Sequence, residues 1–173
     1  IAASVALGII AGSGHAQEKK PVRVGLSIAQ TGPLSGAGKS GLLALQIWRD
    51  DVNGRGGLLG RPVELIVYDD QSNAATVPGI YSKLLDVDKV DLLIGPYSSN
   101  LTAPVMPMVK QRNLLLIGNF ALDANARLRH DKYFSSLPSA SADQWAAPFF
   151  DLAKQLQGKT VALLAADAEF AQT

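Results

Sequence analysis

The chain has no cysteine, few histidines and no excess of charge of either sign. The absence of cysteine excludes disulfides, thiolate nucleophiles and cysteine metal sites. Its two histidines, His15 and His130, do not form a pair at ligand spacing, so we expect no bound metal. The 16 basic residues nearly balance the 15 acidic ones, which does not favour nucleic acid as a partner. We therefore expect a protein without cofactor, metal or nucleic acid.

The first 16 residues differ from the rest of the chain. Residues 1–11, IAASVALGIIA, are apolar and uncharged but too few to span a bilayer. Gly14 and Ala16 occupy the small-residue positions of a signal-peptidase site, and the polar stretch QEKKP follows directly. We interpret residues 1–16 as a secretory signal peptide, truncated at its start and cleaved before Gln17, which predicts a periplasmic protein. A buried N-terminal helix is the alternative, but such a helix would show a polar face.

What the rest of the chain contains is a regular alternation of apolar runs and helical periodicity. With 173 residues and 47% apolar residues, it can form an ordinary core. The runs typical of buried strands are residues 22–28, 62–68, 90–94 and 114–117. Helical spacing of apolar residues lies between them, at 38–53, 74–86 and 101–111. This α/β pattern predicts an open parallel sheet flanked by helices on both faces.

The last third of the sequence is less regular. Residues 132–137 are a candidate fifth strand, residues 139–155 a long helix, and residues 160–165, TVALLA, a further strand. Trp48, earlier in the chain, lies on an apolar helical stripe and is expected in the core. Asp69 and Asp70 could form a catalytic pair, but after a strand they more often cap and tie loops.

The stretch at residues 32–41, GPLSGAGKSG, resembles a phosphate-binding P-loop at first sight. A P-loop needs glycine, four residues, then Gly-Lys-Ser, so Gly38 would require glycine at position 33. That position holds Pro33, and proline removes an N–H from a loop that must donate N–H groups to phosphates. We therefore expect that this loop does not bind nucleotide, and an α/β nucleotide enzyme is the less favoured reading.

The order of motifs along the chain is similar to that of the type I periplasmic solute-binding proteins. The segment VGLSIAQTGPLSGAGKSGLLALQIWRDDVNGRGGLLGRPVELIVYDDQSN resembles the opening of the branched-chain amino-acid-binding family of ABC transporters. VDLLIGPYSSNLTAPV resembles that family's Gly-Pro-x-x-Ser segment, and GKTVALLAADAEF its first strand and ligand loop of the second lobe. The resemblance covers residues 22–170 and implies two α/β lobes that close over a solute.

The resemblance also implies a division of the chain. Residues 17–138 would form lobe one, and residues 139–173 a crossover helix and the first strand of an incomplete lobe two. The function implied is an extracytoplasmic solute-binding protein of an ABC importer, not an enzyme, which delivers its ligand to a membrane permease and is monomeric when complete. A ligand-sensing domain of the same fold is the alternative, because a signal peptide does not separate receptor from sensor.

The resemblance assigns the ligand site to loops at the carboxyl ends of the strands. The Ser99 hydroxyl would grip a ligand carboxylate, with the backbone of Ser98 beside it, because hydroxyl and N–H groups stabilise an anion. Either serine could instead only cap the following helix. Phe170 falls where the family has an aromatic residue on the ligand, or belongs to the core. The expected ligand-binding residues are Tyr97, Ser98, Ser99, Phe120, Ala121, Leu122 and Phe170.

Two positions depart from the amino-acid-binding pattern. Leu122 stands where those relatives carry a threonine, and Ala37 where some carry a tyrosine. A leucine side chain cannot hydrogen-bond an ammonium or a carboxylate, while Phe120 and Tyr97 add aromatic surface. The ligand classes that stay open are amino-acid-like compounds, amides and aromatic acids, with a leucine-type ligand in doubt.

Overall fold

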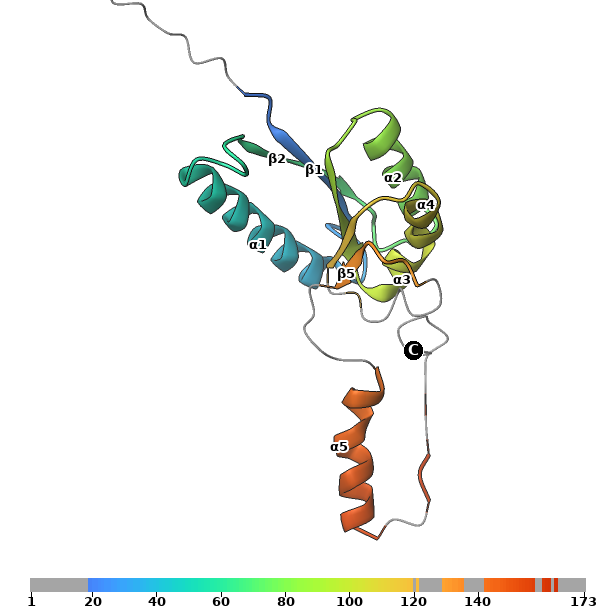
Figure 1. Ribbon diagram of the computed structural model, residues 1–173. Coiled ribbons are helices and arrows are strands. Elements are labelled where there is room, and N and C mark those ends of the chain that lie inside the picture. Colours follow the sequence, from blue (N-terminus) through green and yellow to red (C-terminus); the bar gives the residue numbers. More distant parts are fainter. Residues whose placement is uncertain are drawn as a thin grey trace, which may run out of the picture.

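The computed structural model describes residues 19–119, 121, 129–135, 142–157, 160–162 and 164. Within them a single sheet of parallel strands forms the centre of the fold, in the order β2-β1-β3-β4-β5 (Figure 1). The predicted open parallel sheet is therefore confirmed. The strands are β1 (Val22–Ile28), β2 (Val63–Asp69), β3 (Leu92–Tyr97), β4 (Leu116–Asn119) and β5 (Tyr133–Ser135).

Helices cover the two faces of this sheet unequally. Figure 1 shows α1 alone on one side, with α2, α3 and α4 on the other. Parallel strands require such crossover helices, because each strand must return to the same edge before the next begins. The helices are α1 (Ser35–Gly54), α2 (Val77–Asp86), α3 (Ser99–Thr102), α4 (Met106–Gln111) and α5 (Ala142–Gln155), with a short 3₁₀ helix, η1 (Ala103–Val105), between α3 and α4.

Each face of the sheet has its own apolar core. On the α1 face, alternate residues of β1 from Val22 to Ile28 pack with Val63 and Ile94. On the opposite face, Leu93 and Leu116 pack against buried side chains of α2, α3, η1 and α4. The alternation within β1 follows from the strand's period of two, which sends successive side chains to opposite faces.

The element bounds follow the predictions closely in the first two thirds of the chain. β1 has the predicted bounds, while the helix predicted over 101–111 is divided into α3, η1 and α4. Pro104 and Pro107 fall in that range, and each lacks the N–H that a continuous helix needs. α1 begins at Ser35, three residues before the predicted start at Gly38, so that the expected glycine loop is helical.

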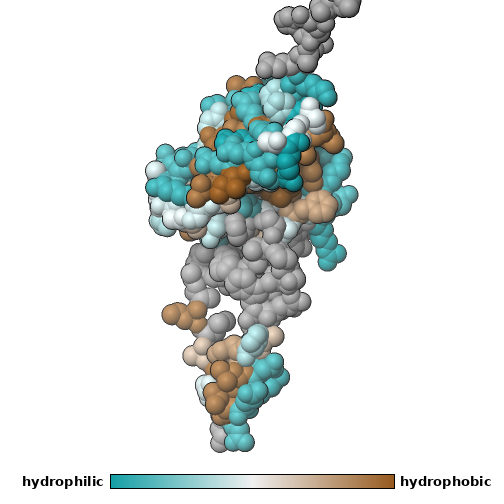
Figure 2. Space-filling view, turned by 90° about the vertical axis from the view of Figure 1, so that its left-hand side faces the viewer, coloured by the Kyte–Doolittle hydropathy of each residue, from teal (hydrophilic) through white to brown (hydrophobic). Residues whose placement is uncertain are grey.

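In the described part of the last third, β5 falls within the candidate strand 132–137, and α5 is the one helix. Figure 2 shows apolar side chains along one side of α5 and hydrophilic ones along the other, with Phe149, Leu152 and Leu156 exposed. Within the range of the predicted strand 160–165, the four described residues are in no strand. A strand needs a hydrogen-bonded neighbour, and the described residues offer them none. Among all the helices described, none is both long and apolar enough to cross a bilayer.

Candidate functional site

The sheet reverses its strand order between β1 and β3, which places a switch point at their carboxyl ends. From β1 the chain leaves for β2 on one side, and from β3 it continues to β4 on the other. In open α/β sheets, the crevice outside such a point is where ligands bind. Four segments meet at this edge: the loops after β1, β2 and β3, and the end of β4.

Asp69, the last residue of β2, holds the loop that follows β1. Its carboxylate accepts hydrogen bonds from the backbone N–H groups of Gln30 at 2.9 Å and Thr31 at 3.2 Å, and from the Thr31 hydroxyl at 2.7 Å. The N–H of Gln71 donates to the same carboxylate at 2.9 Å. Burial alone would raise the pKa of Asp69, but these hydrogen bonds lower it to about 2. The carboxylate therefore acts as a fixed anion that ties two loops together.

Asp70, the next residue, is fully buried and also ties neighbouring segments together. Its carboxylate accepts the Ser27 hydroxyl at 2.9 Å and the N–H of Ser72 at 3.0 Å. Burial raises the pKa of Asp70, with the two hydrogen bonds opposing that rise. Both carboxylates are thus occupied by loop contacts, as expected for residues that cap and tie loops rather than a catalytic pair.

The glycine-rich stretch after β1 forms the first turns of α1 rather than an open loop. Lys39 is exposed on this helix, and the Ser40 hydroxyl donates to the carbonyl of Gly36, within the helix itself. A P-loop instead wraps phosphates with the backbone that precedes its helix. Gly38 serves packing, because a Cβ placed there would lie 2.0 Å from the carbonyl oxygen of Ala29. This geometry agrees with the expectation that the stretch does not bind nucleotide.

Ser98 has the most unusual backbone conformation at this edge. It lies between β3 and α3 with φ 82° and ψ 155°, a region that is populated almost only by glycine. Although it is the residue before α3, its side chain makes no capping hydrogen bond. Its hydroxyl oxygen is buried and has no partner among the described residues. Ser98 therefore occupies the N-cap position of α3 without a side-chain cap, and strain of this kind is typical of functional sites.

The other expected ligand residues are only partly described. Ser99 is fully buried as the first residue of α3, and Tyr97, half-buried, ends β3. Ala121 is fully buried, and its carbonyl accepts the Ser135 hydroxyl at 3.0 Å. The structure thus gathers Tyr97, Ser98 and Ser99 at the switch point, with Ala121 shortly after β4. The remaining three, Phe120, Leu122 and Phe170, lie outside the described residues.

Asn119 belongs to this edge, although the sequence did not single it out. It is the last residue of β4 and pairs in register with Tyr97. Its side-chain nitrogen is buried and, within the described residues, has no hydrogen-bond partner. The signal in the sequence was an amide residue that closes the apolar run LLLIG, at the carboxyl end of a predicted strand. In the sequence, the aromatic and apolar residues of the loop that follows it are the more conspicuous candidates.

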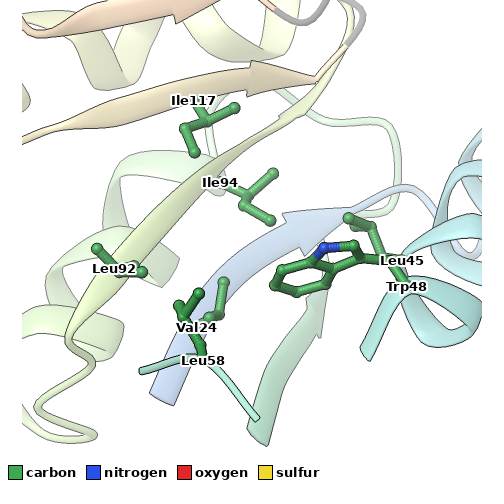
Figure 3. Close-up of a pocket in the computed structure, with 7 residues that line it drawn as sticks. All are labelled: Val24, Leu45, Trp48, Leu58, Leu92, Ile94 and Ile117. Carbon is green, nitrogen blue, oxygen red and sulfur yellow. The ribbon is translucent and has the colours of Figure 1, made fainter. Parts of the chain in front are cut away.

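An apolar groove on the α1 face of the sheet has a different chemistry. Figure 3 shows the Trp48 indole together with side chains from β1, β3 and β4 that line this groove. The groove has a volume of about 360 Å³. Trp48 is 37% exposed there, so the prediction that it is a core residue is wrong: α1 covers β1 but leaves the β3–β4 side of this face open. The groove offers few polar groups to a polar solute. Its lining residues are Val24, Leu45, Trp48, Leu58, Leu92, Ile94 and Ile117.

The described residues offer no cluster of three or more histidine, aspartate or glutamate side chains that could hold a metal ion. The hydrogen-bonding groups at this edge are the carboxyl groups of Asp69 and Asp70, which tie the loops, and the side chains of Ser98 and Asn119, which have no partner among the described residues. Such an arrangement can hold a small polar ligand by hydrogen bonds.

Comparisons with known proteins agree with this architecture. An "Amino acid binding protein" of Pseudomonas aeruginosa is 27% identical over 96 residues, which cover 52% of this chain and 25% of that protein. An ABC transporter substrate-binding protein from Sphaerobacter thermophilus is 28% identical, with a TM-score of 0.66, over 80% of this chain and 38% of the other. A third similar protein is the solute-binding protein of an ABC transporter from Rhodopseudomonas palustris BisB5, solved with 3,4-dihydroxybenzoic acid. It is 21% identical, with a TM-score of 0.75, and the match covers 89% of this chain and 41% of the other.

The match spans about a quarter of the length of the curated relative, and well under half of each solved chain. The model of the family described as "Periplasmic binding protein" matches residues 21–173, nearly the whole chain. The parallel sheet, its switch point and this match agree, and the chain belongs to the periplasmic binding protein family.

Proposed function

We propose that the protein is the extracytoplasmic solute-binding component of an ABC importer, which binds a small amino-acid-like, amide or aromatic-acid ligand. The observation that carries this proposal is Ser98, with its strained backbone and its buried, unpartnered hydroxyl at the switch point. A fold keeps such strain only where the surroundings enforce it. Thr102 does so here, since its hydroxyl and its N–H both donate to the Ser98 carbonyl, at 2.8 and 3.1 Å.

The ligand would lie between this lobe and a second lobe, against the loops at the carboxyl edge. In this proposal residues 17–138 are lobe one, and residues 139–173 begin the crossover into lobe two. Hydroxyls at the turn of Ser98 and Ser99 would donate to the polar end of the ligand, with the backbone of Ala121 and the side chain of Tyr97 beside it. Phe120, Leu122 and Phe170 would supply apolar contacts.

The proposed ligand class follows from which of these contact residues are polar and which are apolar. Leu122 cannot hydrogen-bond an α-amino group, which disfavours free leucine and favours an aromatic acid or an amide. The names of the relatives include both possibilities, since one is an amino acid binding protein and another was solved with 3,4-dihydroxybenzoic acid. Export by the signal peptide at residues 1–16 and delivery to a membrane permease complete the proposal, with the whole protein acting as a monomer.

Calorimetry of the full-length protein tests this function. The panel contains L-leucine, L-valine, benzamide, 4-hydroxybenzoate and 3,4-dihydroxybenzoate. A hydrogen bond to a charged group contributes about 1.5–3 kcal/mol, so Ser98→Ala or Ser99→Ala should weaken binding of a carboxylate about 10- to 100-fold. Failure of every compound to bind would count against the function. Tight binding of leucine would discard the argument from Leu122, and unchanged affinity in both serine variants would discard this turn as the site.

A further inference from the structure

Asn119 is, after Ser98, the second residue at this edge with a buried polar atom that has no partner in the described part of the chain. The residue is 8% exposed, and its Nδ2 atom has no hydrogen-bond partner among the described residues. Most buried polar groups in folded proteins have a partner, and each exception needs an explanation. A buried amide that donates to nothing destabilises the fold, so a leucine of similar size would fit the site better on stability alone.

The described neighbours of Asn119 on two sides offer its amide nitrogen no acceptor. Across the sheet, Asn119 pairs with Tyr97, which directly precedes Ser98. On the α1 side, Gly41 lies close to Asn119: a Cβ added at Gly41 would lie 3.6 Å from Asn119 Nδ2 and 3.3 Å from Ile28 Cδ1. Glycine contributes no side-chain acceptor, and the carbonyls of a helix interior accept from its own N–H groups.

A structural asparagine elsewhere in the chain shows the contrast. Asn53, at the end of α1, uses both ends of its amide to fix β2: its Nδ2 donates to the carbonyl of Val63 at 2.9 Å, and its Oδ1 accepts the N–H of Val63 at 2.7 Å. Asn119 lies in a comparable junction between a strand end and α1, but none of the described residues accepts from its Nδ2. The difference indicates a role other than tying these elements together.

We propose that Asn119 is a specificity-determining residue, whose amide N–H donates to an oxygen of the bound solute next to the Ser98 hydroxyl. This inference rests on the proposed function. An amide nitrogen donates and cannot accept, so the group that it binds must be an acceptor, such as a carboxylate, carboxamide or hydroxyl oxygen. An ammonium group, which is donor only, cannot satisfy it. Asn119 would therefore select solutes that present an oxygen to this edge of the sheet.

Variants of the full-length protein separate this role from a structural one. Asn119→Leu removes the donor at similar volume, and Asn119→Asp replaces it with an anion. Asn53→Leu is the matched control, because it removes an asparagine with a structural role. Each variant is measured for its melting temperature without ligand and for its affinity toward 3,4-dihydroxybenzoate, benzamide and L-leucine.

The proposal expects Asn119→Leu to melt at the same temperature as the wild type or higher, while it binds the best probe about 10- to 100-fold more weakly. Asn119→Asp should lose more affinity for 3,4-dihydroxybenzoate than for benzamide, because two carboxylates repel each other. Asn53→Leu should melt several degrees lower and keep its affinity in the folded fraction.

Two results would overturn the assignment. One is a melting temperature of Asn119→Leu lowered as far as that of Asn53→Leu, which would make Asn119 a structural residue whatever the ligand is. The other is a bound probe whose affinity Asn119→Leu does not change. If the wild type binds none of the probes, the proposed function is what fails, and the melting temperature of Asn119→Leu still decides whether the asparagine has a structural role.

Discussion

The Thr31 hydroxyl donates to Asp69 Oδ2 at 2.7 Å, and the Thr31 N–H donates to Oδ1 of the same carboxylate at 3.2 Å. Through this contact, the end of β2 fixes the loop that follows β1, and with it one side of the candidate site. The two residues are 38 positions apart in the sequence, so the contact exists only because β1 and β2 are neighbours in the sheet.

Replacement of Asp69 should loosen this loop. Asp69→Ala leaves the N–H groups of Gln30, Thr31 and Gln71 without their acceptor, and hydrogen bonds to a charged group contribute about 1.5–3 kcal/mol, less where solvent can replace the partner. We expect a loss of about 1–2 kcal/mol in the free energy of unfolding, measured by urea titration at pH 7. Thr31→Val, which removes only the hydroxyl donor, should lose less. Equal stability of Asp69→Ala and wild type would contradict the tie.

The pH dependence of this contribution follows from the lowered pKa. The ordinary pKa of Asp69 is 3.8, and in the fold it lies at about 2. Because the folded value is the lower one, the stabilisation is complete above the unfolded value and is lost as the pH falls through about 2. Urea titrations between pH 2 and pH 5 should therefore show a smaller acid loss of stability in Asp69→Asn than in the wild type.

Asp70 should behave in the opposite sense. Burial raises its pKa, so the neutral form is favoured in the fold and the ionised form at neutral pH destabilises it. The protonated Asp70 carboxyl therefore stabilises the fold fully at pH values below its ordinary pKa of 3.8. This contribution to the free energy of unfolding is lost as the pH rises through the raised pKa of Asp70 in the folded protein. Asp70→Asn keeps an oxygen for the Ser72 N–H and faces the Ser27 hydroxyl with an amide, and it should equal or exceed wild-type stability at pH 7. A loss of more than about 2 kcal/mol would show that the charge itself is required.

Two glycines of α1, two residues apart, should respond in opposite directions to alanine. At Gly38 a Cβ would lie 2.0 Å from the Ala29 carbonyl oxygen, whereas at Gly36 nothing lies within 4 Å. Gly38→Ala must push α1 away from β1, with an expected loss of about 2–4 kcal/mol, of the order found for severe overpacking. Gly36→Ala should gain up to about 1 kcal/mol from helix propensity. Thermal unfolding of both variants decides, and equal melting temperatures would refute the close approach.

Ser98→Gly should raise stability while it lowers affinity. Glycine adopts φ 82° without the strain that serine carries there, and residues held in such regions cost about 1–3 kcal/mol. The same change removes the hydroxyl proposed to bind the solute. Ser98→Ala serves as the control, because it removes the hydroxyl but keeps a side chain in the strained conformation. The idea fails if Ser98→Gly unfolds more readily than Ser98→Ala.

The sheet could be predicted from the sequence because its signals are local. The bounds of β1 follow from an unbroken run of apolar and β-branched residues, and the parallel arrangement from strands that alternate with helical periodicity. The helix predicted over 101–111 was harder to predict, because Pro104 and Pro107 would each be tolerated in the first turn of a helix. Together they divide the segment into α3, η1 and α4. Trp48 was predicted in the core because it lies on the apolar stripe of α1. Whether that stripe is buried depends on which elements cover β3 and β4, and the sequence of α1 does not contain that information.

The class of fold, the family resemblance and the edge of the sheet where a ligand site belongs follow from the sequence alone, because periodicity and motif order are encoded within short stretches. Which groups at that edge have no partner among the described residues is visible only in the folded protein. Ser98 and Asn119 differ from other polar residues of the chain in what surrounds them: the register of β3 with β4, the absence of a side chain at Gly41, and the hold of Thr102 on the Ser98 carbonyl. These are contacts between distant segments, and a hydrogen bond that is not made leaves no pattern in the sequence.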